Sequence, residues 1–348
     1  MRVLHVMECT IGGTRRHLRD LALGQVAKGV DVHVVAAGLR DEGMLLDFER
    51  MQAAGVHVQR LDMLRAIRPS TDWRHFRALK GILRETRPDI VHSHSSKAGV
   101  LARRASLATG IGRRVHTPHT MAFLFSALFS PFKRRVFRSI ETRLGQATDR
   151  MIAVSESEGE TLRASGVIPF ERIRVVPNGI DPDGWAGAEP LDLAGFGLDP
   201  KRPTLALIGL VYGAKGQDLA IEALSDASLG DWQLLCVGPG EASEFEGLAR
   251  KLGVVDRVRF TGARSDIARV LASVQGLILP SRWEGMPYVV LEAMAAGCPV
   301  LAHPVDGARD VVVDGETGVL CRGISVPALI EGWQRFDGAG PLERARWG

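Results

Sequence analysis

Short apolar runs alternate with longer segments of helical period along almost the whole chain, and this alternation limits its fold more than any other feature. Runs such as RVLHVM, DVHVVAA and DIVHSHS have the length and composition of buried strands. Strands that alternate with helices form βαβ units, in which neighbouring strands are parallel. The sequence therefore predicts an α/β protein built on parallel sheets.

The alternation stops once and then restarts. Strands are expected at 2–7, 31–37, 56–61, 89–95, 113–119, 150–155 and 172–178, and again at 203–210, 232–238, 257–262, 276–281 and 298–303. Residues 177–203 are rich in Pro, Gly and Asp without a sustained period, which is typical of a linker. We predict two doubly wound, Rossmann-like domains, 1–180 and 203–348, joined by a linker at 181–202. Ligands bind beyond the carboxyl ends of such strands, so the two domains are expected to face each other across a cleft.

Charge and cysteine usage narrow the class of protein. Residues 1–180 carry 29 Lys and Arg against 17 Asp and Glu, whereas residues 181–348 carry 15 against 23. A basic half favours polyanions or an anionic membrane surface, but no nucleic-acid-binding motif accompanies it. The four cysteines are far apart and form no C-x-x-C pair. This spacing suggests neither a disulfide framework nor a cysteine zinc site, and it favours a reducing cytoplasm.

Membrane attachment is expected at most at the surface of a bilayer. The N-terminal apolar run is too short for a signal peptide, and no stretch approaches the roughly 18 uncharged apolar residues that span a bilayer. Residues 121–143, MAFLFSALFSPFKRRVFRSIETR, combine phenylalanines with clustered bases. Such a segment docks on anionic lipid, or it is a helix whose apolar face covers the sheet. Both readings stay open, and the basic first half favours a cytoplasmic protein held peripherally at the inner face of the membrane.

The segment with the most candidate ligand-binding groups is residues 281–302, SRWEGMPYVVLEAMAAGCPVLA. Pro287 is expected to open a helix there, with the N–H groups of Tyr288 and Val289 pointing forward as an anion site. Glu292 lies in an otherwise apolar helix, where a carboxylate is costly unless hydroxyl or N–H groups satisfy it. The hydroxyls of a sugar or ribose would do so. The alternative is a glutamate that caps or forms a salt bridge.

The spacing E-x7-E within S-x-x-E-G-x-P, followed by L-E-A-M-A-x-G-x-P-V, resembles the retaining glycosyltransferases of the GT4 type. These include bacterial exopolysaccharide and lipopolysaccharide glycosyltransferases. Other matching segments follow in the same order, namely Gly12-Gly13, HSHSSKAG, TPH, AVSES, VVPNGID, Lys215-Gly216 and DGETGVL. The resemblance covers nearly the whole chain. It implies the two-domain GT-B fold and transfer of a hexose-type sugar from a nucleotide diphosphate sugar to a hydroxyl acceptor.

The resemblance also implies roles for individual residues. Lys215, Glu284 and His119 would be catalytic: Lys215 neutralises the diphosphate, Glu284 orients the donor sugar and His119 contacts the transferred sugar. The leaving phosphate would take the acceptor's proton, so no separate general base is assigned. The implied donor-binding set is Gly209, Lys215, Arg264, Glu284, Gly285, Met286, Pro287, Tyr288 and Glu292, the last holding the ribose. The acceptor and sugar side is Gly12, Gly13 and His119.

Two departures from the family pattern stand out. The family usually reads G-R-L before the Lys-Gly pair, and that arginine helps to clamp the diphosphate, whereas this chain has Leu210 after Gly209. Arg264 or Arg282 could compensate. In addition, 28 residues follow Leu320, fewer than in relatives, so the closing helical element is expected to be short.

Metal and cofactor sites are not expected. Asp181 and Asp183 spell D-x-D, but they follow an Asn-Gly turn in the linker. His92, His94, His116 and His119 end neighbouring strands without an acidic or cysteine partner, which favours a polar lining over a zinc site. The acceptor is expected to be a lipid-linked or cell-surface glycan. A nucleotide-sugar epimerase of the same fold and a catalytically inactive nucleotide-sugar-binding subunit remain alternatives.

Overall fold

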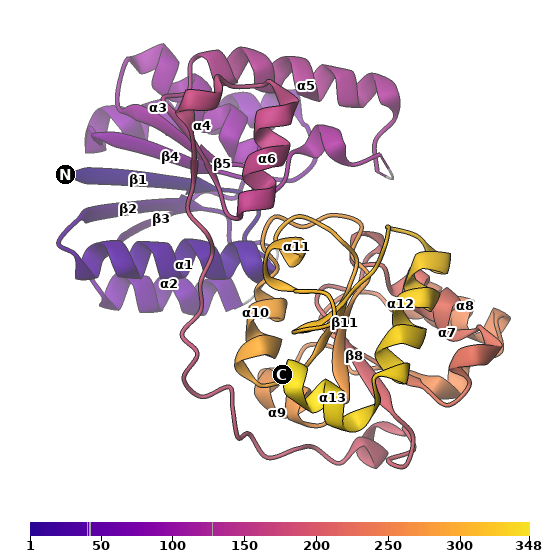
Figure 1. Cartoon of the computed structure of the whole chain (residues 1–348). Coiled ribbons are helices and arrows are strands. Elements are labelled where there is room, and N and C mark those ends of the chain that lie inside the picture. The colour runs from indigo at the N-terminus through magenta and orange to yellow at the C-terminus, as the bar shows by residue number, and fades with distance from the viewer. Residues whose placement is uncertain (40, 42, 127) are drawn as a thin grey trace. The chain divides into compact units, whose positions relative to one another are not determined.

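The computed structural model describes residues 1–39, 41, 43–126 and 128–348, which form two compact units, Met1–Asn178 and Gly179–Gly348. Each unit is built on one sheet in which every pair of adjacent strands is parallel. The prediction of an α/β protein with two doubly wound sheets is therefore confirmed (Figure 1).

The first unit has a seven-stranded sheet in the order β3-β2-β1-β4-β5-β6-β7. Its strands are β1 (Arg2–Met7), β2 (Asp31–Ala36), β3 (His57–Arg60), β4 (Ile90–His94), β5 (Arg113–Thr117), β6 (Arg150–Ala153) and β7 (Ile173–Val175). Its α-helices are α1 (Gly12–Ala27), α2 (Gly43–Ala53), α3 (Pro69–Thr86), α4 (Ser96–Thr109), α5 (Pro131–Gln146) and α6 (Glu156–Ser165). Figure 1 shows α1 and α2 on one side of this sheet and α3, α4 and α5 on the other.

The second unit has a six-stranded sheet in the order β10-β9-β8-β11-β12-β13. Its strands are β8 (Thr204–Ile208), β9 (Gln233–Val237), β10 (Val258–Phe260), β11 (Gly276–Leu279), β12 (Val300–Ala302) and β13 (Gly318–Leu320). Its α-helices are α7 (Gln217–Leu224), α8 (Ser243–Lys251), α9 (Ile267–Ala272), α10 (Tyr288–Ala295), α11 (Ala308–Val311), α12 (Val326–Gly338) and α13 (Gly340–Trp347).

Central strands such as β1, β8, β9 and β11 are buried on both faces, which explains why they are nearly continuous apolar runs. In the second unit, Trp232 packs edge-on against Trp333 and Phe336 of α12. Cys236, Cys298 and Cys321 are also buried in this unit. These three cysteines and Cys9 are all free thiols. Among the described residues, no helix is both long and apolar enough to cross a bilayer.

The structure differs from the sequence predictions at several boundaries. β13 was not predicted, because three residues are too few to show a period. The segment expected as a linker contributes Leu193 and Leu198 to the buried core of the second unit. Pro287 precedes α10 as its N-cap residue instead of opening the first turn. β5 ends at Thr117, so His119 lies beyond the strand that it was expected to end.

Candidate active site

The donor-side residues of the second unit gather where its strand order reverses. β8 and β11 are neighbours in the sheet, although β9, β10 and several helices separate them in the chain. Gly209 follows β8, and the segment from Pro280 to Glu284 follows β11. Ligands of open parallel sheets bind at the carboxyl ends of strands at such a reversal. The topology therefore selects this edge as the candidate site.

Lys215 and Glu284 form an ion pair at this edge. The Nζ atom of Lys215 lies 2.5 Å from Oε1 of Glu284, and the hydroxyl of Ser281 donates to the same oxygen at 2.7 Å. The Lys215 side chain is 21% exposed and that of Glu284 is 13% exposed, so both remain accessible. Burial alone would lower the pKa of Lys215, but the Glu284 carboxylate and its hydrogen bond outweigh it and raise the pKa. Lys215 is therefore a cation at neutral pH.

Two glycines bring the loops of this site together. Gly216 has φ +76°, and a Cβ atom there would lie 2.1 Å from the carbonyl oxygen of Pro280. Gly307 also has φ +76°, and its Cβ would lie 2.5 Å from the carbonyl oxygen of Gly285. A side chain at either position would therefore push a loop away from its neighbour. This explains why the Lys-Gly pair can lie beside the loop that carries Glu284.

The loop from Gly285 to Pro287 leads directly into α10. Gly285, Met286 and Pro287 are buried, whereas Tyr288 and Glu292 are partly exposed. Tyr288 and Glu292 are four residues apart on the helix and so share one face. The first backbone N–H groups of α10 and the positive end of its dipole follow this loop, as an anion site requires.

The two arginines that could replace the missing family arginine are each held by a carboxylate. Arg264 makes a two-pronged ion pair with Asp266 at 2.6 and 2.8 Å. Arg282 makes a similar pair with Asp218 at 2.6 and 2.8 Å. The carbonyl oxygen of Leu210 accepts a hydrogen bond from the Gln217 amide at 2.9 Å. Either arginine would have to leave its present carboxylate before binding a diphosphate.

In the first unit, His119 lies close to other histidines at the corresponding reversal between β1 and β4. Its φ is +51°, a left-handed backbone angle that is uncommon for a residue other than glycine. Its Nε2 atom lies 3.4 Å from Nδ1 of His94, and its ring packs edge-on against His17 with centroids 4.6 Å apart. The histidine chosen from the sequence is thus one member of a cluster.

The cluster differs from the polar lining predicted from the sequence. His92 and His94 point to the same side of the sheet and have ring centroids 4.1 Å apart. His116 instead hydrogen-bonds to Ser93 and packs against Gly99 of α4, on the opposite face, so its assignment to the lining was wrong. His5 joins the cluster, with Nδ1 3.1 Å from Nε2 of His94.

Ring nitrogens of this cluster form two groups of three. Those of His5, His92 and His94 lie within 4.8 Å of one another, as do those of His17, His94 and His119. The sequence analysis did not identify His5 and His17 as members of this cluster. They reach it only because β1 pairs with β4 and because α1 packs beside these strands, and neither contact can be inferred from local sequence. Ser281 is the serine of the S-x-x-E motif, but the sequence analysis gave it no role, and the structure shows its hydroxyl donating to Glu284. Gly12 and Gly13 form the exposed first turn of α1, the helix that carries His17.

Comparison with known proteins gives consistent results. The family model described as Glycosyltransferase Family 4 matches residues 11–183, and that described as Glycosyl transferases group 1 matches residues 202–336. The UDP-Gal:alpha-D-GlcNAc-diphosphoundecaprenol alpha-1,3-galactosyltransferase of Escherichia coli is 28% identical over 258 residues, 72% of this chain and 66% of that protein. A D-inositol 3-phosphate glycosyltransferase of Mycobacterium sp. (strain JLS) is 33% identical over 253 residues, 68% of this chain and 56% of that protein.

A solved structure shows the same fold. Anabaena HepE in complex with UDP-glucose has a TM-score of 0.78 at 22% identity, covering 100% of this chain and 92% of that chain. The match to the two curated relatives spans 66% and 56% of their lengths. The two family models together account for nearly the whole chain, and the protein therefore belongs to the GT4-type glycosyltransferases of GT-B fold.

Proposed function

We propose that the protein transfers a hexosyl unit from a nucleoside diphosphate sugar to a hydroxyl acceptor with retention of configuration. The bond between the anomeric carbon and the diphosphate breaks, and a bond from that carbon to the acceptor oxygen forms on the same face of the sugar. The acceptor's proton passes to the departing phosphate oxygen. No metal ion or separate general base is part of the proposal.

The observation that carries the proposal is the Lys215–Glu284 pair at the strand reversal of the second unit. The departing diphosphate gains negative charge, and fixed positive groups that meet it there lower the barrier. Lys215 supplies a full charge, and the N-terminus of α10 supplies a dipole and N–H groups. Glu284, positioned by Lys215 and Ser281, accepts hydrogen bonds from sugar hydroxyls. The HepE structure contains UDP-glucose, which supports a donor of this class.

The remaining residues follow the family pattern. We assign the ribose hydroxyls to Glu292, and the sugar and diphosphate to the backbone of the loop from Gly285 to Pro287. His119 contacts the transferred sugar, and Gly12 with Gly13 lets a substrate approach the backbone.

A lipid-linked acceptor at an anionic membrane surface completes the proposal, and α5 supports it. One side of this helix is anchored, because the Glu141 carboxylate accepts from the buried Arg103 of α4 at 2.7 Å. The other side exposes Phe132 by 75% and Val136 by 40%. An exposed apolar stripe beside bases is the pattern of a helix lying at a lipid interface. The E. coli relative is named for a diphosphoundecaprenol-linked acceptor.

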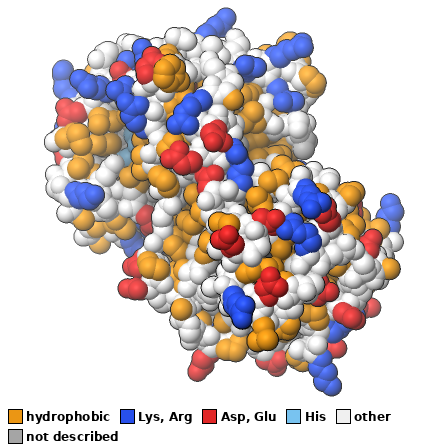
Figure 2. Space-filling view, viewed as in Figure 1, with side chains coloured by type: hydrophobic (Ala, Val, Ile, Leu, Met, Phe, Trp, Pro, Cys, Tyr) orange, Lys and Arg blue, Asp and Glu red, His pale blue; other side chains and the backbone are white. Residues whose placement is uncertain are grey.

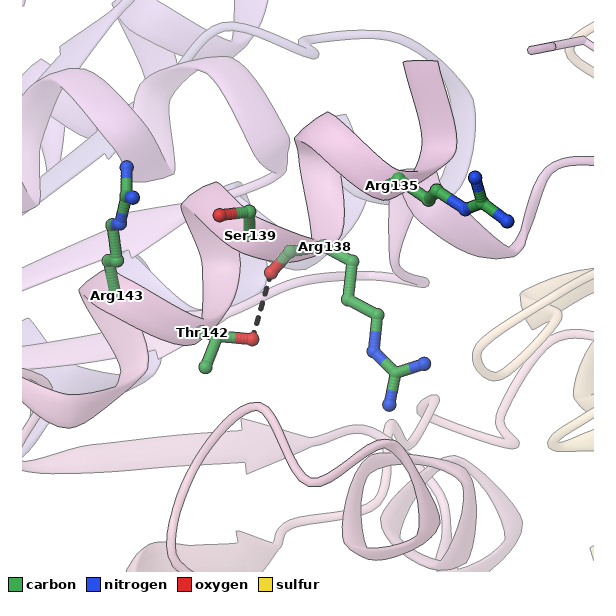
Figure 3. A pocket seen from close by; sticks show the side chains of 5 residues that line it. All are labelled: Arg135, Arg138, Ser139, Thr142 and Arg143. Carbon is green, nitrogen blue, oxygen red and sulfur yellow. Dashed lines mark hydrogen bonds between the residues drawn. The ribbon is translucent and has the colours of Figure 1, made fainter. Parts of the chain in front are cut away.

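A basic groove of about 430 Å³ runs along α5, lined by Arg135, Arg138, Ser139, Thr142 and Arg143. Figure 3 shows Arg135 and Arg138 toward one end and Arg143 toward the other, with the Thr142 hydroxyl donating to the Arg138 carbonyl at 2.9 Å. Lys and Arg side chains also lie over the helices at the top of the first unit in Figure 2. Such a groove suits the phosphate groups of a lipid surface.

Transfer assays on Lys215→Ala and Glu292→Ala test the activity. Lys215→Ala should lose at least about a hundredfold in kcat/KM, the size expected when a group that stabilises transition-state charge is removed. Glu292→Ala should lose roughly tenfold to a hundredfold, mainly through a higher donor KM, because it removes a charged group that hydrogen-bonds the ribose. Lys201→Ala and Glu244→Ala, at exposed positions of the same unit, are the matched controls.

The product identifies the reaction. Mass spectrometry after incubation with several nucleotide sugars and a lipid extract should show a glycosylated acceptor. Conversion of the donor without an acceptor would indicate an epimerase, and donor binding without turnover would indicate an inactive binding subunit. Wild-type rates in both active-site variants would refute the assignment of this edge.

A further inference from the structure

Three histidines and one glutamine form a continuous hydrogen-bonded chain in the first unit. Oε1 of Gln25, on α1, lies 2.8 Å from Nε2 of His5. Nδ1 of His5 lies 3.1 Å from Nε2 of His94, and Nδ1 of His94 lies 3.4 Å from Nε2 of His119. We call this set, Gln25, His5, His94 and His119, the histidine relay.

The imidazoles of the relay are neutral at physiological pH. Burial lowers the pKa of His5 to about 4, although the hydrogen bond to Gln25 acts in the other direction. Burial also lowers the pKa of His94 and His119 well below 6.5, and neighbouring histidines add to the effect. A neutral imidazole carries one N–H group and one lone pair. Each ring of the relay can therefore donate at one nitrogen only.

The glutamine oxygen selects the direction of the relay. Because Oε1 of Gln25 can only accept, His5 donates from Nε2 and has its lone pair on Nδ1. His94 then donates from Nε2 to His5, which leaves its own lone pair on Nδ1. His119 in turn donates from Nε2 to His94. The lone pair of His119 is consequently on Nδ1.

Nδ1 of His119 is available to a ligand. The His119 residue is only partly buried, and no group in the described part of the chain hydrogen-bonds to this nitrogen. We propose that the histidine relay fixes His119 as the Nε2–H tautomer, so that Nδ1 accepts a hydrogen bond from a hydroxyl or amide N–H of the bound sugar. His5, His94 and Gln25 are positioning residues that act through His119.

This proposal narrows the substrate class. A lone pair attracts a donor group and repels the oxygens of a carboxylate or phosphate, which only accept. The group that meets His119 therefore belongs to a neutral or N-acylated sugar, and a uronic acid carboxylate is rejected there. This specificity rests on the proposed function, whereas the tautomer of His119 does not.

The tautomer can be read without any substrate. Two-bond proton–nitrogen correlation spectra of protein labelled with 15N-histidine distinguish a protonated from an unprotonated ring nitrogen, and His119→Asn assigns the His119 signals. We expect a protonated Nε2 and an unprotonated Nδ1. Gln25→Glu keeps an acceptor and should preserve this signature. Gln25→Lys offers only donors, so it should reverse all three rings and protonate Nδ1 of His119.

Kinetics then link the tautomer to specificity. Relative to Gln25→Glu, Gln25→Lys should lower kcat/KM for a neutral hexosyl donor about tenfold, the loss of one hydrogen bond. Gln25→Met, which neither donates nor accepts, should give a mixture of tautomers and serves if the lysine variant does not fold.

Three results would overturn the proposal. They are a protonated Nδ1 of His119 in the unmodified protein, an unchanged tautomer in both Gln25→Lys and Gln25→Met, and histidine spectra that change when EDTA removes a bound ion. A wild-type transfer rate in Lys215→Ala would count only against the proposed function, so the two failures can be told apart.

Discussion

Leu210 lies where GT4-type enzymes usually carry an arginine, one residue after Gly209 at the end of β8. Its carbonyl is held by Gln217, and its side chain is partly exposed. The nearby arginines expected to replace it are committed to Asp266 and Asp218. Lys215 is paired with Glu284 in the same way, so each of these three side chains must give up contact with a carboxylate before it binds a diphosphate.

Restoring an arginine should strengthen donor binding. Leu210→Arg is expected to lower the KM for the nucleotide sugar about tenfold or more, because charge-assisted hydrogen bonds to phosphate are worth roughly 1.5–3 kcal/mol. Steady-state kinetics with Leu210→Gln as the uncharged control would measure this. An unchanged KM would mean that this position does not approach the diphosphate.

Gly307 offers a second residue-scale prediction. Gly307→Ala should destabilise the second unit by about 1–3 kcal/mol and raise the donor KM, because its Cβ meets the loop at Gly285 and its φ is +76°. Gly315→Ala is a matched control, since Gly315 has φ +79° but open space around a Cβ. Urea unfolding and donor kinetics provide the readouts. Equal effects in the two variants would show that backbone strain alone is responsible.

The sequence could predict some of these residues and not others. Glu284, Glu292 and Lys215 belong to local motifs that resemble those of GT4-type enzymes, and that resemblance implies their roles. His5 and His17 belong to no motif, because they join the cluster only through the pairing of β1 with β4 and the packing of α1. Contacts between distant segments of this kind cannot be inferred from spacing along the chain.

At the level of single elements, α5 is the clearest case of two different faces on one helix. Arg134 donates to the Phe123 carbonyl at 2.7 Å and Arg138 to the Ser165 carbonyl at 3.0 Å, so these arginines have structural partners. Arg135 and Arg143 are exposed and line the groove. The last two are therefore the better probes of lipid binding.

Replacing Arg135 and Arg143 with serine should weaken binding to anionic vesicles. Each basic residue near such a surface contributes about 1 kcal/mol, so the double variant should bind roughly thirtyfold more weakly. Vesicle sedimentation at low salt measures this, with Arg322→Ser/Arg346→Ser in the second unit as a control of equal charge. Equal binding of the two double variants would exclude α5 as the docking surface.

Elements with a clear period were predictable from the sequence, and those without one were not. β1 and β2 begin at the residues expected from the sequence. β13 is too short for its alternation to be recognised. The linker prediction failed at Leu193 and Leu198, because Pro, Gly and Asp mark an irregular backbone but do not reveal whether nearby leucines are buried.

On the scale of the whole molecule, histidines are divided unequally: nine of the ten lie in the first unit, and His303 is the one in the second. Burial lowers the pKa of His5 to about 4 and lowers that of His92, His94, His116 and His119 well below 6.5. The unfolded chain therefore binds more protons than the folded chain between pH 6.5 and 4.

Acid should consequently unfold the first unit before the second. The stability contributed by the neutral histidines is present above pH 6.5 and is lost as the pH falls toward 4, and His5 alone accounts for about 3 kcal/mol. Pulse proteolysis in urea at pH 7.5 and 5.0, with peptides identified by mass spectrometry, would follow each unit. Equal shifts of both units over this range would contradict the expectation.

The three buried thiols of the second unit have a practical consequence. Burial raises the pKa of Cys298 and of Cys321 to about 12 and raises that of Cys236 further, so the native thiols hardly form the reactive thiolate. An alkylating dye would react with them only when the surrounding structure opens. The rate of alkylation of these three thiols would thus measure the rate at which the second unit opens, and no cysteine would have to be introduced for the experiment.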